Sequence, residues 1–493
     1  MKWFVEQYQG IFQRTLEILV GLLTWTVLTM PFWLSFSHPA VVAYFVLLFD
    51  VYFFYKSATV AFDGIRSYLR ITYDAKINWQ EKLKNLKGSS STYHLLLLPN
   101  FKETVEKLRT TLDHIVNQKF PQSRIFVVLA MEERDEDGRQ KASVLCREFK
   151  KKLGGFLITF HRLGQNEVVG KASNEACAAK KAANFLKKRG INHKDVIVTS
   201  MDADSLLPSQ YLSYLTFKFL NDKNRFYHFY HAPVLLYSNY WQISLIVRLK
   251  STLDSISRLA NLMRPERLIH VSTYSMSLSL LKKVGYWDTN IIPEDWHIFF
   301  QAFFTLGEKV ATIPLFLPIS GDAARAKTFL GSLSYRYEQE RRWAWGVTDI
   351  PYVIQKFLTT PKIPFWPKFF RLSHLLESHL LWPVNFFILT LGATIPLLIN
   401  PAFGRTVLGH TLPSLAGFIL TSTTGFLIIL IIIDIKARPA RPKTYSLAKT
   451  PLLFFQWFLL PIVSFFFSSL PGLDAHTRLL LGKRLEYKVT EKV

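Results

Sequence analysis

Residues Val196–Asp204 read Val-Ile-Val-Thr-Ser-Met-Asp-Ala-Asp, an apolar run that ends in two carboxylates at alternate positions. The apolar part, Val196–Met201, predicts a buried strand. Ligands collect beyond the carboxyl ends of parallel strands, and two carboxylates one residue apart lean to the same side of an extended backbone, where they can share a hard cation. The alternative is a pair of acids solvated in a loop, but the position after a buried-type strand favours the metal site.

The flanking sequence alternates short apolar runs with amphipathic segments. The predicted elements are strands Tyr93–Leu98, Arg124–Ala130, Phe156–Phe160 and Val196–Met201, and helices Glu103–Asn117, Arg139–Lys152 and Ala172–Lys188. This alternation predicts an α/β domain with a mostly parallel sheet and helices on both faces. The second half, from Leu206 to Trp345, is less regular. Its amphipathic stretch Trp241–Met263 suits a helix on the membrane surface or one packed against the domain's own core.

Long apolar runs outside this domain predict a multi-pass membrane protein. They are Ile18–Phe36, Ala40–Tyr55, Leu380–Leu398, Leu412–Ile433 and Leu452–Leu470. Most reach the roughly 20 residues that a spanning helix needs. The second run carries Asp50, which is costly in lipid unless it faces protein or water. Pro396 and Pro461 indicate that the third or the last run is re-entrant or broken.

These runs divide the chain into four predicted regions. Residues 1–56 form an N-terminal transmembrane hairpin, residues 57–370 a cytosolic domain, residues 371–472 the C-terminal transmembrane helices and residues 473–493 a basic tail. Five spans would place the basic tail outside, against the positive-inside tendency, so one run is not a simple span.

The net charge of the chain is +24, and its Lys and Arg residues are concentrated between the second and third apolar runs and in Lys436–Lys449. Both regions are therefore expected in the cytosol, and the cell membrane is the expected location. Zinc-finger spacing, an aromatic RNA-binding signature and a basic zipper helix are all missing from the sequence, so we expect no nucleic-acid partner. Anionic lipids and diphosphate substrates explain the charge more simply.

Three further motifs carry chemistry. Glu294-Asp295 suits either a helix start or a general base with a raised pKa beside aromatic residues, and both readings are compatible. In Gln339-Glu340-Arg341-Arg342-Trp343, the residues Gln339, Arg342 and Trp343 stand at positions i, i+3 and i+4 and therefore share one helical face. The Arg guanidinium suits phosphate oxygens, and the Trp ring suits a sugar ring. A surface charge run with a core Trp is the alternative. Gly170-Lys171-Ala172-Ser173-Asn174, at a helix start, favours an anion.

The order of these motifs resembles the family 2 glycosyltransferases: Leu98-Pro99-Asn100, Gly-Lys-x-x-Asn, Asp-x-Asp, Glu-Asp and Gln-x-x-Arg-Trp. It most resembles the membrane synthases of the cellulose, chitin and hyaluronan type. The resemblance covers Tyr93–Gly346 and implies a GT-A type fold flanked by transmembrane helices. It also implies inverting transfer of a sugar from a UDP- or GDP-sugar to a growing glycan, with Mg²⁺ or Mn²⁺ as cofactor.

The resemblance also implies site residues. Asp295 would be the catalytic base and Asp204 the metal ligand. Trp343 would contact the acceptor. The donor would be bound by Pro99, Glu132, Lys171, Asp202, Gln339 and Arg342.

Three features depart from the pattern of these synthases, and the first is Asn100-Phe101-Lys102-Glu103 after the first strand, in place of the commoner Asn-Glu pair. The second strand ends Met131-Glu132-Glu133 where an Asp usually reads the base, and Glu340 stands where Gln or Arg is commoner. Transfer of a single sugar to a lipid-linked or membrane-bound acceptor is therefore the alternative function. A non-enzymatic membrane scaffold or transporter with structural acid pairs is a third.

Overall fold

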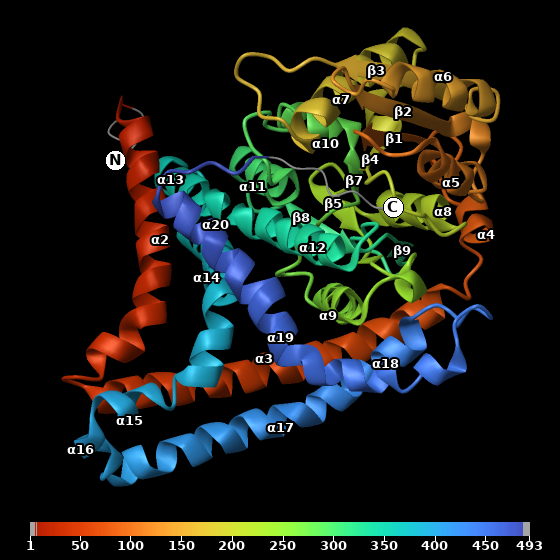
Figure 1. Ribbon diagram of the computed structural model, residues 1–493. Coiled ribbons are helices and arrows are strands. Elements are labelled where there is room, and N and C mark those ends of the chain that lie inside the picture. Colours follow the sequence, from red (N-terminus) through yellow and green to blue (C-terminus); the bar gives the residue numbers. More distant parts are fainter. Residues whose placement is uncertain (1–4, 6, 487–493) are drawn as a thin grey trace. The chain divides into compact units, whose positions relative to one another are not determined.

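The computed structural model describes residue 5 and residues 7–486 (Figure 1). The chain forms two compact units that interleave along the sequence. The first contains the residues up to 68 together with 244–260 and 332–485, and we call it the helical unit. The second contains 69–243 and 261–331, and we call it the sheet unit.

A mixed seven-stranded sheet organises the sheet unit, in the order β3-β2-β1-β4-β7-β5-β8 (Figure 1). Its strands are β1 (Tyr93–Asn100), β2 (Ile125–Glu132), β3 (Gly155–His161), β4 (Val196–Ser200), β5 (His228–His231), β7 (Tyr274–Ser277) and β8 (Ala311–Pro314). Four neighbouring pairs are parallel, and only the β4–β7 and β7–β5 pairs are antiparallel. The mostly parallel sheet expected for a GT-A type domain is therefore confirmed.

Helices cover both faces of this sheet. One face packs on α4 (Trp79–Lys84), α5 (Val105–Val116), α6 (Gly138–Phe149) and α8 (Tyr211–Asn221), whose apolar side chains join Leu96, Leu98, Val127 and Leu129 in one core. The other face packs on α7 (Lys171–Lys188), which also contacts β1, β2 and β3 and buries a row of alanines. Small alanine side chains allow the helix to lie close to the strands. All four predicted strands and all three predicted helices are confirmed, within three residues at each end.

The strand order reverses at β1. The chain runs from β1 outward to β2 and β3, and then returns to place β4 on the other side of β1. Ligands of open α/β sheets bind at such a reversal, outside the carboxyl ends of the two strands. Asn100 and Asp202 stand at these ends.

The less regular second half completes the sheet unit. Its remaining elements are α10 (Leu278–Lys283), α11 (Glu294–Leu306) and a two-stranded sheet of β6 (Val234–Leu235) and β9 (Ile319–Ser320). Glu294 and Asp295 are the first two residues of α11, as the helix-start reading predicted. Acidic residues at this end complement the helix dipole.

The helical unit is built from long apolar helices and a set of shorter ones. They are α2 (Gln9–Leu34), α3 (Pro39–Asp74, which continues into the sheet unit), α9 (Leu245–Asn261), α12 (Phe329–Ala344), α13 (Asp349–Thr359), α14 (Phe365–Leu391), α15 (Ile395–Ile399), α16 (Pro401–Gly404), α17 (Val407–Ala437), α18 (Leu452–Phe455), α19 (Leu460–Ser464) and α20 (Leu470–Leu480).

Within the described residues, four segments are long and apolar enough to cross a membrane: Gln9–Leu34, Pro39–Asp74, Val407–Ala437 and Leu447–Leu480. The predicted span Leu380–Leu398 is not among them. Helix α14 ends at Leu391, before Pro396, and its middle carries polar residues such as Glu377 and His379. The run around Pro461 is helical but broken into α18, α19 and α20, with a π-helical turn at Phe465–Ser469.

Close packing joins these helices. A Cβ atom at Gly21 of α2 would lie 2.6 Å from the Leu480 Cβ of α20, so glycine permits this approach. Asp50 is buried in α3, facing protein as its cost in lipid requires. The amphipathic segment with two readings forms α9, whose Leu249 packs against Trp457 and Val463. Trp457 and Val463 belong to the candidate span Leu447–Leu480 and not to the core of the sheet unit, so the core reading is not confirmed and both readings of this segment stay predictions.

Candidate active site

Lys171 is the centre of a charged cluster at the carboxyl end of β4. Its Nζ donates to Asp202 Oδ1 (2.9 Å) and to the Ser272 carbonyl (2.8 Å), and lies 3.2 Å from Glu294 Oε1. Burial alone would lower the pKa of Lys171, but the charges of Asp202, Glu175 and Glu294 hold it well above its usual value. A fixed cation at a helix N-terminus suits an anionic ligand. The structure thus joins three of the sequence motifs.

Ser272, which no motif indicated, links the two predicted acid pairs. Its hydroxyl donates to Asp202 Oδ2, and its backbone N–H donates to Asp295 Oδ2 (3.2 Å). Its φ of 63° lies in the left-handed region, which is uncommon for a residue other than glycine. Antiparallel pairing of Ser200 with Tyr274 brings the start of β7 to the end of β4, which explains the contact. No local sequence signal could reveal it.

Asp295 is a carboxylate suited to proton transfer near neutral pH. Burial raises its pKa to about 7, and the charge of Glu294 adds to the rise, whereas Lys171 and the N–H groups of Ser272 and Trp296 oppose it. The two N–H groups bind different oxygens, at 3.2 and 2.9 Å, so the carboxylate is held in one orientation. A base with this pKa is half ionised at pH 7.

Glu175 forms a second, deeper carboxylate under Lys171. It is fully buried, 4.0 Å from Lys171 Nζ, and accepts a hydrogen bond from the Ser200 hydroxyl (2.6 Å). Burial raises its pKa to about 8, although Lys171 opposes the shift. Its neighbour Asn174 donates to the Ala130 carbonyl (2.8 Å) and so ties the start of α7 to the end of β2.

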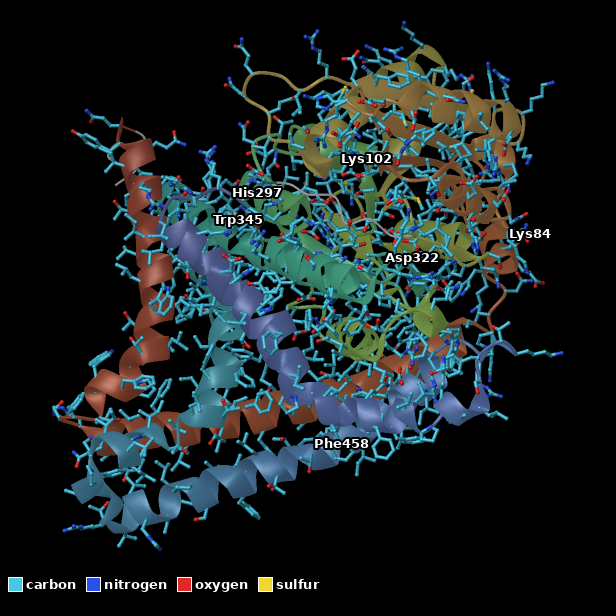
Figure 2. The ribbon with its side chains drawn as sticks, in the orientation of Figure 1. Lys84, Lys102, His297, Asp322, Trp345 and Phe458 are labelled. Atoms are coloured by element: carbon cyan, nitrogen blue, oxygen red, sulfur yellow. The ribbon has the colours of Figure 1, made fainter. Side chains whose placement is uncertain are left out.

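Asp204 lies on the other side of the same turn and is buried. Its Oδ2 accepts the Asp322 backbone N–H (2.9 Å), and Asp322 in turn pairs with Lys107 (3.1 Å); Asp322 is labelled in Figure 2. Among the described residues, no group of three or more His, Cys, Asp or Glu side chains could hold a metal ion. Two carboxylates nevertheless fit Mg²⁺ or Mn²⁺, because such ions take their remaining ligands from phosphates and water.

The ends of β1 and β2 form the predicted base-reading region. Glu132 is buried and paired with Arg134 (2.5 Å), and Pro99 lies in register with Ala130. The buried carboxylate of Asp135, which sequence reasoning missed, accepts the Lys102 N–H (3.2 Å) and pairs with Lys141 (2.9 Å). Asp135 stands in a run of polar loop residues that gives no signal of burial. The donor roles of Pro99 and Glu132 stay predictions.

Gln339, Arg342 and Trp343 are on α12, in the part that belongs to the helical unit. The predicted helix is confirmed. Gln339 is buried, whereas Arg342 and Trp343 are partly exposed. Their assignment to donor and acceptor stays a prediction.

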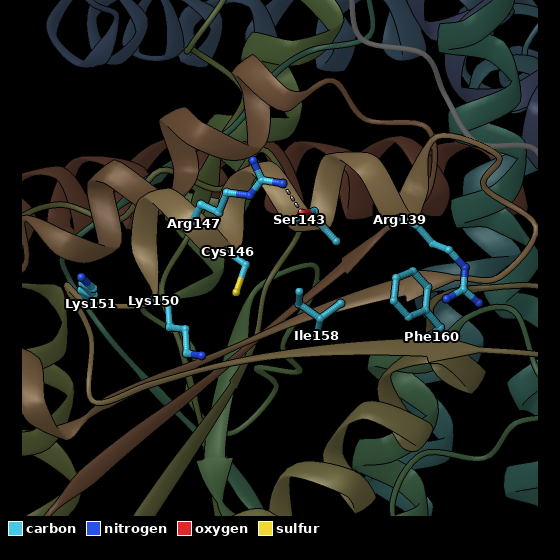
Figure 3. Close-up of a pocket in the computed structure, with 9 residues that line it drawn as sticks. Arg139, Ser143, Cys146, Arg147, Lys150, Lys151, Ile158 and Phe160 are labelled. Carbon is cyan, nitrogen blue, oxygen red and sulfur yellow. Dashed lines mark hydrogen bonds between the residues drawn. The ribbon is translucent and has the colours of Figure 1, made fainter.

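A separate hollow lies at the β3 edge of the sheet, between α6 and β3 (Figure 3). Arg139, Arg147, Lys150 and Lys151 line it, around an apolar floor that includes Phe160. Strands β2 and β1 separate β3 from β4, and the lining has no carboxylate. This hollow is therefore not the site formed by Asp202 and Asp295.

The sequence profile of Glycosyl transferase family group 2 matches residues 197–467, more than half of the chain, and the chain belongs to this family. The matched segment includes Asp202, Asp204, Asp295 and the Gln339–Trp343 motif. The prediction of a nucleotide-sugar-dependent glycosyltransferase is confirmed by this membership, and the scaffold or transporter reading is excluded as the primary function. No protein of curated function matches the sequence.

Solved glycosyltransferases show weak similarity to the chain. A mannosyltransferase, PcManGT from Pyrobaculum calidifontis, in complex with GDP-Man and Mn²⁺, is 16% identical over 79% of this chain and 99% of its own, with a TM-score of 0.43. S. aureus TarS 1-349 is 13% identical over 79% and 91%, with a TM-score of 0.37. Glucosyl-3-phosphoglycerate synthase from Mycobacterium tuberculosis is 11% identical over 56% and 82%, with a TM-score of 0.32. We draw no functional argument from similarities at this level.

Proposed function

We propose that this member of Glycosyl transferase family group 2 transfers a sugar, with inversion at the anomeric carbon, from a UDP- or GDP-sugar to a growing glycan at the membrane. The observation that supports the proposal most is the arrangement of Asp295 beside the Lys171–Asp202 pair. Asp295, with a pKa of about 7, is a base that can take the proton from the acceptor hydroxyl, and Lys171 is a fixed cation that can stabilise the negative charge on the leaving diphosphate. Ser272 links the two.

On the donor side, Lys171 and Asp202 bind the nucleoside diphosphate, with Pro99 and Glu132 beside the base. Asp204, with Asp202, would hold Mg²⁺ or Mn²⁺. When bound, the ion stabilises the negative charge on the leaving diphosphate. Gln339 and Arg342 bind the diphosphate oxygens, for which a guanidinium is well suited.

On the acceptor side, Trp343 offers an indole face to the acceptor sugar. Asp295 takes the proton from the acceptor hydroxyl while its oxygen forms the new bond to the anomeric carbon. The bond from that carbon to the diphosphate breaks, and the electron pair leaves with the nucleoside diphosphate. The protonated Asp295 then returns its proton to water.

The glycan product rests on the resemblance to the cellulose, chitin and hyaluronan synthases and on the apolar helices. The four candidate spans support an integral membrane protein. With four spans, the residues before the first span and after the fourth lie on the same side as the catalytic domain, which agrees with a cytosolic basic tail and a cytosolic catalytic domain. The loop 438–446 between the third and fourth spans then lies on the opposite side, against the expectation from its basic residues. Transfer of one sugar to a lipid-linked acceptor uses the same donor site and is the second candidate, because Glu340 departs from the synthase pattern.

The test is nucleoside diphosphate release by the detergent-purified protein. A panel of UDP- and GDP-sugars with Mg²⁺ or Mn²⁺ is compared for the wild type and Asp295→Asn. Release with one donor that disappears in the variant supports the proposal, and no release with any donor and acceptor contradicts it. Product length then separates the candidates, since a single added sugar excludes glycan synthesis.

A further inference from the structure

A closed ring of four buried charges joins α9 and α12 inside the helical unit. Lys250 Nζ lies 2.5 Å from Asp254 Oδ1 and 2.8 Å from Glu340 Oε1, and Arg336 pairs with both Asp254 and Glu340. The side chains of Arg336 and Glu340 are completely buried. We call these four residues the α9–α12 ion cluster. Its two positive and two negative groups balance.

Stability alone does not explain this cluster. Removing two pairs of charges from water costs much of what their attraction returns, and apolar residues of similar volume would often be at least as stable. The function of the cluster must therefore be sought in the groups that it holds. Two of these belong to the Gln-x-x-Arg-Trp motif.

The first group held by the cluster is the amide of Gln339. Arg336 Nη1 donates to Gln339 Oε1 at 2.7 Å. A guanidinium has donors and no acceptor, so only the amide oxygen can face it. The amide nitrogen therefore faces the other way. Among residues 5 and 7–486, Gln339 Nε2 has no hydrogen-bond partner, so its two N–H groups remain for an acceptor such as a phosphate oxygen.

The second group is the indole of Trp343. The Arg336 guanidinium carbon lies 5.1 Å from its ring centroid, and that of Arg258 lies 5.3 Å from it. Two cations at these distances hold the ring by cation–π attraction. Arg336 thus contacts both the predicted donor-binding Gln339 and the predicted acceptor-binding Trp343.

We infer that the α9–α12 ion cluster is a positioning device for the Gln-x-x-Arg-Trp motif, in which Arg336 fixes the Gln339 amide as a hydrogen-bond donor to the diphosphate of the nucleotide-sugar. Asp254 and Glu340 hold Arg336 in place. Because one arginine neutralises only one of these two carboxylates, Lys250 neutralises the remaining negative charge. This role accounts for the carboxylate at position 340, where the synthases that the chain resembles have Gln or Arg more often. The inference rests on the proposed function, since it takes Gln339 to be a diphosphate ligand.

The experiment measures the donor KM and kcat, together with the Kd of UDP or GDP in the presence of Mg²⁺ or Mn²⁺. Arg336→Lys keeps the charge but loses the fork that reaches Gln339, Asp254 and Glu340 at once. We expect its donor KM and nucleotide Kd to rise about 10- to 100-fold, the effect of one lost hydrogen bond to a charged group, with a smaller change in kcat. Unchanged KM and Kd would overturn the inference.

The matched control is Arg341→Lys. Arg341 is the next arginine on α12 and is also ion-paired, to Glu338 and to Asp474 (2.8 Å). Within the described residues, its guanidinium makes no hydrogen bond to Gln339. The donor KM and the nucleotide Kd of the Arg341→Lys variant should stay within about twofold of the wild-type values. An equal loss in both variants would show a general effect on the helix and reject a specific role for Arg336.

A second variant covers the case in which Arg336→Lys does not fold. Gln339→Glu keeps an oxygen for Arg336 but presents an acceptor instead of N–H groups to the diphosphate. We expect the apparent Tm to stay near that of the wild type while the nucleotide Kd rises more than 10-fold. Wild-type affinity in this variant would overturn the assigned amide orientation. Because Kd is measured without turnover, the inference and the proposed reaction fail separately.

Discussion

Replacing Asp295 with asparagine should make the protein inactive and, at alkaline pH, more stable. The ordinary pKa of the aspartate side chain is 3.8, and burial together with the charge of Glu294 raises it to about 7 in the folded chain. The folded state therefore holds its proton up to a higher pH than the unfolded state does. Ionising Asp295 at higher pH costs folding free energy, and an asparagine at this position does not have that cost.

The size of the effect follows from the shift. The stability that the proton provides is complete below about pH 4 and is lost as the pH rises through about 7. One pKa unit corresponds to about 1.4 kcal/mol, so the rise of roughly three units amounts to at most about 4 kcal/mol at pH 8. The advantage of Asp295→Asn over the wild type should grow between pH 4 and 7 and then level off. The loss of a general base should lower kcat about 10²- to 10⁴-fold.

Two measurements check this prediction in detergent. Thermal unfolding of both proteins from pH 4 to 9 gives the stability difference, and nucleoside diphosphate release gives kcat/KM, which should rise with pH around an apparent pKa near 7 in the wild type. The control is Asp288→Asn, in the loop before α11. The Asp288 carboxylate faces His297, which lowers its pKa below the ordinary value of 3.8, so this variant should remain active and should be less stable than the wild type by an amount that hardly changes above about pH 5.

The reasoning about Asp295 is refuted by either of two results. A stability difference that does not change with pH would show that its pKa is not raised by the folded structure. Retained turnover in Asp295→Asn would show that another group accepts the proton of the acceptor hydroxyl.

Three further predictions test the site and the topology. Ser272→Ala and Ser272→Gly both lose the bond to Asp202 and should lose activity to a similar extent, but the glycine variant should be more stable by about 1 kcal/mol, because it relieves the positive φ; equal Tm values would argue against strain. Asp204→Asn should raise the Mg²⁺ or Mn²⁺ concentration needed for half-maximal nucleotide binding at least tenfold, and an unchanged requirement would exclude Asp204 as a ligand. In a chain whose cysteines have been replaced, a membrane-impermeant maleimide added to intact cells should label Ser37→Cys and spare Lys84→Cys, which is exposed in the sheet unit; the reverse pattern would place the catalytic domain outside.

The sequence predicted the frame of the sheet unit well. Apolar strands such as Val196–Ser200 and the amphipathic helices between them are local patterns, and local patterns predict secondary structure directly. Predictions were weaker in the helical unit, where apolar composition is shared by spanning and broken helices. The run Leu380–Leu398 illustrates the difference, because the end of α14 at Leu391 depends on the backbone around Pro396.

By itself, the sequence determined the order of the motifs, and with them the family and the candidate residues Lys171, Asp202 and Asp295. Only the tertiary structure showed that Ser272 links the last two, because the contact depends on antiparallel pairing of strands about 70 residues apart. It also showed that Glu340 is a buried partner of Lys250 and Arg336, although the sequence suggests a surface charge run. The physical reason is the same in both cases. Periodicity reports which side of its own element a residue occupies, whereas the partner of a charge is decided by distant elements that pack against it.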